Sequence, residues 1–468
     1  MTASRDETLP PGVVTDVSGF KMRDEMKRTL TSLRETLGTE QVELVTEPEK
    51  GGSCIVARPQ TSGHVSSILR EATAKEVAVI PSGSGLAGPG DLKDDSIVLD
   101  MSGMKEIVNV DGSSLTVTAQ AGIRMKDLDD RLKGRGYIPG ITPHPFSPST
   151  LGGIIAEGRV GPYMSELEGT GELIVSMEAV LPGGEIMHST ATPRSATGPD
   201  IVGILPGSRG TLAVMTEITV RICRVPERRI FTSFTFERMS DGIEALRKIM
   251  RAGLRPSFMR LLDQESKGHA LGDRKPGKEG VLLALVFEGL DSVAQAQCSL
   301  CGEVFSAGGG MDLGPEPADE LWKGRAWGGL PGIEEHERTG KKRHGIMEVR
   351  SLWSGVIPVY GWIMNAASGG VTGRAVITQA SPEGAAVWFV FDDAGEAASV
   401  RREAKKRVRN AAAEVCDEVG ASIGFHSGVG LSKAVLKKRE NPELVDLYHD
   451  VKKILDPGEI LNPGGLGI

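Results

Sequence analysis

The first half of the chain alternates amphipathic segments with short apolar runs. Residues 62–75 carry apolar side chains at helical spacing, on a face formed by Val65, Ile68, Leu69 and Ala72. The run 77–80 that follows is wholly apolar, as in a buried strand. The same rhythm predicts strands over 54–57, 96–99, 107–110, 115–118 and 212–223, helices over 21–38 and 125–134, and a hairpin of 174–181 with 185–189. This alternation predicts a domain of mixed helices and sheets.

The glycine-rich turns that lie beside apolar runs in the first half of the chain end near Val225. Beyond it the pattern predicts strands over 230–236 and 281–288, helices over 240–252 and 291–307, and a last helix over 445–455 that ends before the prolines at 457 and 463. We therefore expect four parts: an N-terminal arm and helix (1–45), a first domain (46–225), a second domain (226–420) and a C-terminal segment (421–468) whose chemistry points back to the first domain.

Three glycine-rich turns lie beside the apolar runs of the first domain. They are Ile80–Gly88, Thr150–Gly153 and Gly207–Leu212. Glycine permits positive φ and a close approach of the backbone to a ligand, and successive N–H groups in such a turn form a nest for anions, of which a diphosphate is the usual occupant. One such turn is weak evidence, but three together suggest a single large cofactor wrapped by backbone.

Composition narrows the classes of function. The net charge of −8 argues against a general nucleic-acid surface, and the aromatic content of 4% disfavours base stacking. Five cysteines without a disulfide framework fit a reducing cytoplasm. The close pair Cys298 and Cys301 falls in an expected helix, where we interpret it as packing, and we expect no metal site. Without an apolar leader or a long apolar span, we expect a cytoplasmic protein, and peripheral membrane association stays open.

An ordered set of motifs carries a family resemblance. The motifs occupy residues 58–60, 80–85, 99–104, 119–122, 149–153, 207–212 with 216–217, and 455–463. In this order they resemble the flavoproteins of the vanillyl-alcohol-oxidase type. The resemblance implies an α+β fold with a split, two-subdomain FAD-binding domain of the PCMH type (46–225), an inserted α+β cap domain (226–420) and a C-terminal segment (421–468) that returns to the flavin.

The resemblance assigns the glycine loops to FAD. The residues expected to cradle the diphosphate are Pro81, Ser82, Gly83, Ser84, Gly85, Leu86 and Ala87. Those expected to line the flavin and its ribityl chain are Pro143, His144, Ser149, Thr150, Gly152 and Gly153. Those expected under the adenine end are Gly210, Thr211, Leu212, Val214 and Met215. Residues 80–88 have no histidine where some relatives attach flavin covalently, so we expect non-covalent FAD.

Within the family, the cap is most similar to that of alkyldihydroxyacetonephosphate synthases. The similar segments are 193–200, 259–263, 268–270 and 373–379, while 321–325 resembles glycolate and D-lactate dehydrogenases. This chain departs from the synthases in placing Trp388 at their catalytic tyrosine and a single histidine, His426, where they have three in a row. Arg209 replaces the usual acidic residue of the third glycine loop. An indole N–H donates a hydrogen bond but cannot shuttle a proton near neutral pH.

The candidate catalytic residues are His426, Arg325 and Arg374, and the candidate substrate-binding residues are Arg260, Arg325, Arg374 and Trp388. His426 is flanked by glycines, and the resemblance puts its segment at the flavin ring, where an imidazole accepts a substrate proton. The guanidinium groups suit a carboxylate or a phosphate. Trp388 is interpreted either as part of the substrate pocket or as core filling.

Three functions stay open. The leading hypothesis is an FAD-dependent oxidoreductase that oxidises a small anionic alcohol, most simply a 2-hydroxy acid, by hydride transfer to flavin N5. The second is a transferase of the alkyldihydroxyacetonephosphate synthase type, and the third is a non-catalytic flavoprotein subunit. As partners we expect a small anionic substrate, a second copy of the chain, and an electron acceptor such as oxygen, a quinone or an iron–sulfur protein.

Overall fold

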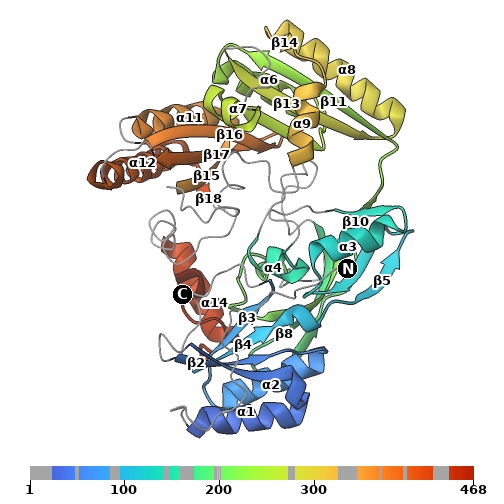
Figure 1. Cartoon of the computed structure of the whole chain (residues 1–468), viewed down its shortest axis with the longest axis vertical. Coiled ribbons are helices and arrows are strands. Elements are labelled where there is room, and N and C mark those ends of the chain that lie inside the picture. Colours follow the sequence, from blue (N-terminus) through green and yellow to red (C-terminus); the bar gives the residue numbers. More distant parts are fainter. Residues whose placement is uncertain are drawn as a thin grey trace, which may run out of the picture.

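The chain folds into two bodies. The computed structural model describes residues 24–47, 52–84, 95–140, 148–158, 173–193, 198, 200, 202–271, 280–324, 345–368, 371–393, 398–424 and 442–467. One body contains the described residues up to 224 together with 442–467, and the other contains those from 228 to 424 (Figure 1). The passage from 224 to 228 joins them along one side of the molecule (Figure 1).

The first sheet of the first body has the order β1-β2-β4-β3, with β2, β4 and β3 parallel. Its strands are β1 (Val42–Glu47), β2 (Gly52–Ala57), β3 (Val79–Ser82) and β4 (Ser96–Asp100). The helices α1 (Asp24–Leu37) and α2 (Ser62–Ala74) pack on it. The helix expected as part of an N-terminal arm therefore belongs to this core, because Leu33 lies in the same buried cluster as Ile55 and Val79.

The second sheet of the first body has the order β5-β6-β10-β8-β9, with β7 paired to β10. Its strands are β5 (Ile107–Asp111), β6 (Thr116–Gln120), β7 (Tyr137–Pro139), β8 (Ile174–Val180), β9 (Ile186–His188) and β10 (Val214–Arg224). It packs against α3 (Met125–Lys133) and α4 (Leu151–Ala156). The predicted hairpin is confirmed, since β8 and β9 pair in antiparallel register.

The second body is built on one antiparallel sheet of eight strands in the order β14-β11-β13-β12-β16-β17-β15-β18. The strands are β11 (Arg228–Phe236), β12 (Phe258–Leu262), β13 (Val281–Gly289), β14 (Met311–Asp312), β15 (Gly345–Leu352), β16 (Val371–Ala380), β17 (Gly384–Asp393) and β18 (Ser422–Gly424). An antiparallel sheet covered by helices is typical of an α+β domain, as expected.

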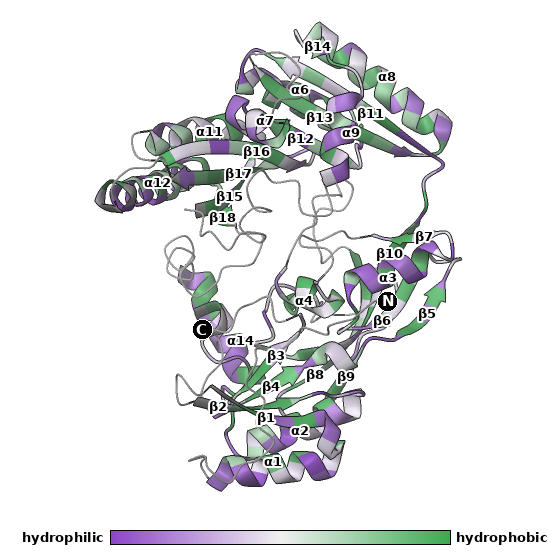
Figure 2. Cartoon of the chain, viewed as in Figure 1, coloured by the Kyte–Doolittle hydropathy of each residue, from purple (hydrophilic) through white to green (hydrophobic). Residues whose placement is uncertain are grey.

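Helices cover both faces of this sheet unequally. A large apolar core joins one face to α6 (Met239–Arg251), α8 (Asp291–Ala307), α11 (Trp353–Ala367) and α12 (Ala398–Val419). A smaller cluster joins the other face to α7 (Gln264–Leu271) and α9 (Glu316–Lys323). Figure 2 shows the strands as mainly hydrophobic and α12 as rich in hydrophilic positions. Cys298 and Cys301 lie on α8 and pack into the larger core as free thiols.

The second glycine-rich segment differs from the turn that its sequence predicts. Gly152 and Gly153 lie in the first turn of α4, for which Thr150 is the N-cap. Glycine is needed at 152 for packing rather than for a turn, since a Cβ there would lie 2.8 Å from the Cβ of Ala121. Within the described part of the chain, no helix has both the length and the apolar character needed to cross a bilayer.

Candidate functional site

The end of β3 meets the start of α4. Residues 81–84, at the end of β3 and just beyond it, are half-buried. Gly83 lies against Thr150, which is 3% exposed. A Cβ at position 83 would sit only 2.2 Å from the Thr150 hydroxyl oxygen, so no side chain fits there without a shift. The first and second predicted cofactor loops are thus in direct contact.

The third predicted loop packs on the other two. Gly210 adopts φ +69°, and a Cβ there would lie 3.0 Å from the ring of Pro81. The amides of Gly207 and Arg209 donate to the carbonyls of Ile155 and Ala156 at the end of α4, at 2.9 and 2.7 Å. Loops that are far apart in sequence therefore converge at one place, and backbone groups and small side chains form much of their surface.

The C-terminal segment reaches the same place. Leu461 forms a parallel bridge with Val79 of β3. The Val79 amide donates to the Ile460 carbonyl, and the Asn462 amide donates to the Val79 carbonyl, both at 2.8 Å. The side-chain amide of Asn462 also donates to the Arg209 carbonyl at 2.8 Å. The backbone of Arg209, rather than its side chain, thus ties the third loop to the tail.

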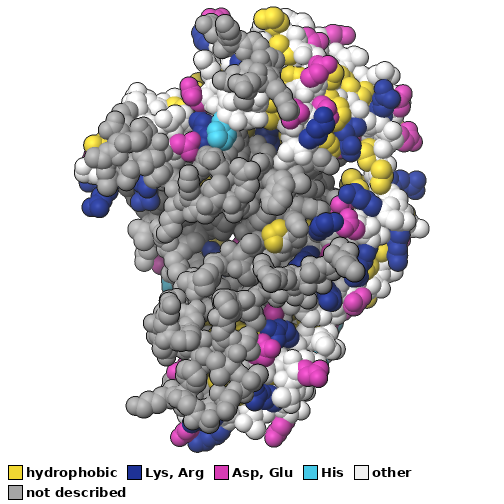
Figure 3. All heavy atoms as spheres, viewed as in Figure 1, with side chains coloured by type: hydrophobic (Ala, Val, Ile, Leu, Met, Phe, Trp, Pro, Cys, Tyr) yellow, Lys and Arg dark blue, Asp and Glu magenta, His cyan; other side chains and the backbone are white. Residues whose placement is uncertain are grey.

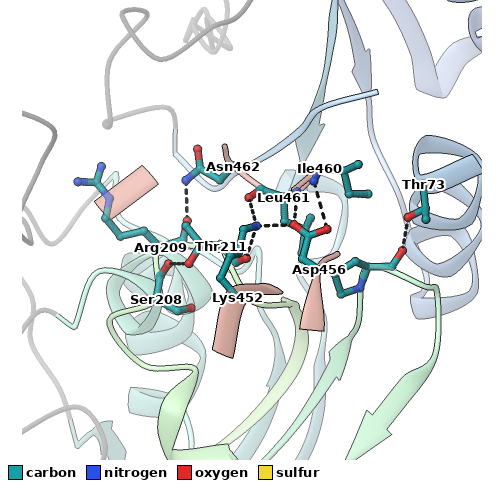
Figure 4. Close-up of polar contacts among 10 residues, drawn as sticks. Thr73, Ser208, Arg209, Thr211, Lys452, Asp456, Ile460, Leu461 and Asn462 are labelled. Atoms are coloured by element: carbon teal, nitrogen blue, oxygen red, sulfur yellow. Dashed lines mark hydrogen bonds and ion pairs between the residues drawn. The ribbon is translucent and has the colours of Figure 1, made fainter. Parts of the chain in front are cut away.

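A buried ion pair joins the last helix, α14 (Pro442–Leu455), to these loops (Figure 4). The Lys452 ammonium pairs with the Asp456 carboxylate and donates to the carbonyls of Thr211 and Leu461, each at 2.7 Å. Asp456 accepts from the amides of Ile460 and Leu461 at 3.1 and 2.8 Å. The two charged side chains are 3% and 1% exposed. Burial lowers the pKa of Lys452, and its pairing with Asp456 opposes that shift without cancelling it.

Three of the ordered motifs of the first body also meet. The Arg58 guanidinium bonds to Asp100, at the end of β4, at 3.1 Å and to Glu43 on β1 at 3.0 Å. Gly122 lies beside Met101, where a Cβ would come within 1.7 Å of the Met101 carbonyl oxygen. These contacts explain why the motifs at 58–60, 99–104 and 119–122 occur together.

Three predicted substrate residues share one face of the second body's sheet. Alternate residues of a strand point to opposite faces, and Arg260, Arg374 and Trp388 lie on the side opposite the large helical core, with the smaller cluster of Phe258, Leu262 and Val376. Their exposed fractions are 0%, 3% and 3%. Trp388 packs within that cluster, on the strand between Val376 and Glu348.

Arg260 is the most deeply buried of these residues. Its guanidinium stacks 4.5 Å from the centre of the Phe258 ring and donates to the Met259 carbonyl at 2.7 Å. Burial lowers the pKa of Arg260 to about 9. A buried cation of this kind favours any anion that approaches it.

Asp263 organises the segment after Arg260. It lies at the start of α7, where its carboxylate accepts from the Ser266 amide at 2.7 Å and from the Ala375 amide of β16 at 2.6 Å. Burial raises the pKa of Asp263, and the two hydrogen-bond partners oppose that shift. The residue fixes α7 against β16 next to Arg374, which explains why the motifs at 259–263, 268–270 and 373–379 belong together.

Arg374 lines a pocket of about 390 Å³ between α7 and the ends of β16 and β17. The lining residues are Gln264, Glu265, Lys267, Gly268, His269, Thr372, Arg374 and Asp392. Arg374 forms an ion pair with Asp392, and Lys267 is 1% exposed. The sequence pattern did not single out Lys267 or His269 as site residues, although 268–270 belongs to a recognised motif.

Several predicted site residues lie outside the described part of the chain: Gly85, Leu86, Ala87, Pro143, His144, Arg325 and His426. The described chain leads to His426 through β18, whose Gly424 pairs with Glu348. Glu348 is itself opposite Trp388 across β15 and β17.

Among the described residues, no group of three His, Cys, Asp or Glu side chains is placed to hold a metal ion. On the face in Figure 3, acidic and basic side chains are interspersed.

Two family models match this chain. Residues 54–190 match the FAD binding domain family, and residues 225–466 match the C-terminal domain of FAD linked oxidases. The FAD-linked oxidoreductase YgcU of Escherichia coli K12 is 28% identical over 428 residues, covering 87% of this chain and 88% of that protein. Alkyldihydroxyacetonephosphate synthase of Caenorhabditis elegans is 27% identical over 457 residues (88% and 75%).

Further relatives and solved structures agree on the fold. The mitochondrial cytochrome-linked D-lactate dehydrogenase of Arabidopsis thaliana is 26% identical over 424 residues, covering 88% of this chain and 73% of that protein. A solved alkyldihydroxyacetonephosphate synthase superposes with a TM-score of 0.73 at 19% identity, covering 97% and 88% of the two chains. p-Cresol methylhydroxylase gives 0.72 at 15% identity, covering 96% and 98%. The chain therefore belongs to the FAD-linked oxidase family, and it is an enzyme that binds FAD.

Proposed function

We propose that this enzyme oxidises a small anionic alcohol, with 2-hydroxy acids as the substrate class. The observation that carries the proposal is the pair of buried arginines, Arg260 and Arg374, on one face of the sheet. Relatives that include a D-lactate dehydrogenase support the same class of reaction. When bound, FAD supplies the acceptor for the hydride that the alcohol loses.

Arg374 is the proposed anchor for the substrate carboxylate. A guanidinium carries five N–H donors in a fixed fork that matches a carboxylate with two parallel hydrogen bonds. Asp392 already orients this fork, and the adjoining pocket of about 390 Å³ has room for a small organic acid. Lys267 and His269 line the same pocket, together with the carboxylates of Glu265 and Asp392.

His426 is the proposed proton acceptor. The family resemblance places its segment at the flavin, and the intrinsic pKa of imidazole suits removal of a hydroxyl proton near neutral pH. Because oxidation releases one proton and one hydride, a base and an electron acceptor must act together. Residues 80–88 contain no histidine where some relatives attach flavin covalently, so the proposal takes FAD to be bound non-covalently.

A transferase of the alkyldihydroxyacetonephosphate synthase type is the second candidate. The relative from C. elegans and the solved synthase favour it. Trp388 counts against it, because the resemblance puts this residue at the catalytic tyrosine and here it is 3% exposed within an apolar cluster. A buried indole cannot exchange a proton with a substrate.

Product analysis separates the two candidates. Purified enzyme is incubated with a panel of 2-hydroxy acids and an artificial electron acceptor, and in parallel with an acyl glycerone phosphate and a long-chain alcohol. The proposal expects 2-oxo acid from the first mixture, loss of this product in His426→Ala, and no ether product from the second. Ether formation without any 2-oxo acid would establish the transferase instead.

A further inference from the structure

The pocket beside Arg374 is built from α7 on one side and from the ends of two paired strands on the other. Thr372 and Arg374 of β16 point to the same face, because alternate residues of a strand share a face, and Thr372 is directly opposite Asp392 of β17. The helix α7 lies beside β16 (Figure 1), and the Ser266 hydroxyl donates to the Ala375 carbonyl at 3.0 Å. Hydrogen bonds thus fix the two walls relative to each other.

No described residue that lines this pocket has an apolar side chain. Apart from Gly268, each of the lining residues named above carries a side chain that donates or accepts hydrogen bonds. Most small-molecule pockets are instead lined by hydrophobic and aromatic side chains, with a few polar groups that fix orientation. The lining therefore fits a ligand that is polar along its whole length, rather than an acid with an alkyl or aryl chain.

The positive and negative charges of the lining balance. Lys267 and Arg374 supply two positive charges, and Glu265 and Asp392 supply two negative charges. Once a substrate carboxylate is bound to Arg374, the net charge of the site is negative, so a second anionic group on the substrate would be repelled. The balance favours a substrate with one negative charge over a dicarboxylate or a phosphate ester.

The two carboxylates of the pocket favour hydrogen-bond donors on the ligand. An ionised carboxylate only accepts hydrogen bonds, whereas the ammonium of Lys267 only donates them. A hydroxyl group does both, so a chain of hydroxyls can donate to Glu265 and accept from Lys267. The side chains of Gln264, His269 and Thr372 also exchange hydrogen bonds of both kinds with hydroxyls. This mixture of donors and acceptors matches a polyol.

We propose that this pocket selects a polyhydroxylated 2-hydroxy acid, the chemical class of the aldonic acids. The inference rests on the proposed function and adds the nature of the carbon chain beyond C2. Arg374 binds the carboxylate, and Glu265 and Gln264 bind hydroxyls further along the chain, which makes Glu265 a specificity-determining residue. In the reaction the C2–H and O–H bonds break and a C2=O bond forms. The hydride goes to FAD and the proton to the proposed base, which leaves reduced flavin and a 2-oxo aldonate.

Anaerobic titration of the FAD-loaded, full-length enzyme tests the class of substrate. The flavin band is followed with D-gluconate, D-mannonate, D-lactate, 2-hydroxyhexanoate and 2-hydroxyglutarate, one at a time. The two aldonates cover both configurations at C2, 2-hydroxyhexanoate has the same chain length without the extra hydroxyls, and 2-hydroxyglutarate carries a second carboxylate. We expect one aldonate to reduce the flavin with a half-saturation concentration roughly tenfold or more below those of the other three acids.

A substitution on α7 tests the residue that recognises the hydroxyls. Glu265→Gln keeps the shape of the side chain and removes the charged acceptor, and the position is exposed, so the fold should tolerate the change. The preference for the aldonate over lactate should fall roughly tenfold. Glu303→Gln makes the same change at an exposed position of α8, outside the pocket, and should leave this preference unchanged.

A ligand that cannot react separates recognition from oxidation. The 2-deoxy analogue of gluconate keeps the carboxylate and the hydroxyls from C3 onward but lacks the hydroxyl that is oxidised. We expect calorimetry to show that it binds the parent enzyme and binds roughly tenfold more weakly to Glu265→Gln. If it binds in this way while no 2-hydroxy acid reduces the flavin, the polyol class stands and the proposed oxidation fails.

Two results would overturn the inference. One is reduction of the flavin by lactate or 2-hydroxyhexanoate at concentrations as low as any aldonate requires, which would leave the proposed oxidation intact. The other is a 2-deoxy analogue that does not bind, or that binds equally well to the parent enzyme and to Glu265→Gln.

Discussion

The Lys452 ammonium donates a hydrogen bond to the carbonyl of Thr211, a residue 241 positions earlier in the chain (Figure 4). The same ammonium holds the Leu461 carbonyl and pairs with Asp456. One buried side chain thus joins the third predicted cofactor loop to the C-terminal segment that bridges to β3. The tail acts as part of the FAD-binding body, although it follows the whole second body in sequence.

Lys452→Met is expected to loosen the third cofactor loop. The change leaves the Asp456 carboxylate buried without its cation, which typically costs about 3–5 kcal/mol of folding free energy. We expect a lower melting temperature and weaker FAD binding in a fluorescence titration. The visible circular dichroism of the bound flavin should also change.

The neighbouring lysine supplies the control for Lys452. Lys453 is exposed on the same helix, so Lys453→Met should leave FAD binding and stability near the parent values. Adding Asp456→Asn to Lys452→Met removes the unpaired charge and should recover part of the stability but not the loop geometry. Equal FAD affinity in the parent and in Lys452→Met would contradict the role of Lys452.

Gly83→Ala is expected to separate the first two cofactor loops. The new methyl group would lie 2.2 Å from the Thr150 hydroxyl oxygen, so β3 or the start of α4 must move. We expect FAD affinity to fall by at least tenfold, measured by equilibrium titration of the apoprotein. Adding Thr150→Ala removes the clashing atom and should restore part of that affinity, less the loss of the α4 cap, about 1 kcal/mol.

Gly63→Ala is the matched control for the glycine substitution. A Cβ at Gly63 meets only the Thr61 hydroxyl, at an ordinary 3.7 Å, and the residue lies in α2. Alanine should stabilise that helix slightly and leave FAD affinity unchanged. Parallel losses in Gly63→Ala and Gly83→Ala would show that the contact with Thr150 is not the cause.

Arg374→Lys is expected to weaken substrate binding, and Arg374→Gln is expected to weaken it more. Lysine keeps the charge but loses the forked geometry, and glutamine loses both. We expect KM for an anionic substrate to rise roughly tenfold in the first and about a hundredfold in the second, with smaller changes in kcat. Arg255→Gln, at an exposed position, should change neither constant. A fall in kcat alone would instead place Arg374 in the chemical step.

Asp263 is expected to make stability depend on pH in a defined direction. Its pKa is raised by burial, so the folded protein keeps this proton to higher pH than the unfolded chain. Asp263 therefore contributes most to the free energy of unfolding when the pH is below 3.8, its ordinary pKa. This contribution declines as the pH rises through the pKa of Asp263 in the folded protein. Relative to Asp263→Asn, the parent should lose unfolding free energy between acidic and neutral pH. A relative gain would show that the Ser266 and Ala375 amides hold the carboxylate charged.

Local patterns in the sequence were sufficient for many elements. The expected helix over 291–307 matches α8, and the expected hairpin matches β8 and β9, because periodicity and turn residues act over short distances. The glycine-rich segments could also be recognised in the sequence. The helix α4 could not be predicted, because Gly152 is required by its contact with Ala121, and local sequence patterns do not report contacts between distant residues.

The site could be predicted only in part. Arg260, Arg374 and Trp388 lie on three different strands. The register that brings their side chains to one face depends on pairing across the sheet, which no local pattern in the sequence gives. Lys452 and Asp456 were missed because, apart from each other, their partners are backbone groups that leave no pattern in sequence. The four-residue spacing of a lysine and an aspartate directly before Pro457 was the available signal.

Anaerobic reduction of the bound flavin tests the central claim most directly. The FAD-loaded enzyme is mixed with D-lactate, glycolate and other 2-hydroxy acids, one at a time, while the visible flavin band is followed. We predict saturable bleaching by at least one of these acids, with a higher half-saturation concentration in Arg374→Gln. A yellow protein that dithionite bleaches but no 2-hydroxy acid does would contradict the proposed oxidation.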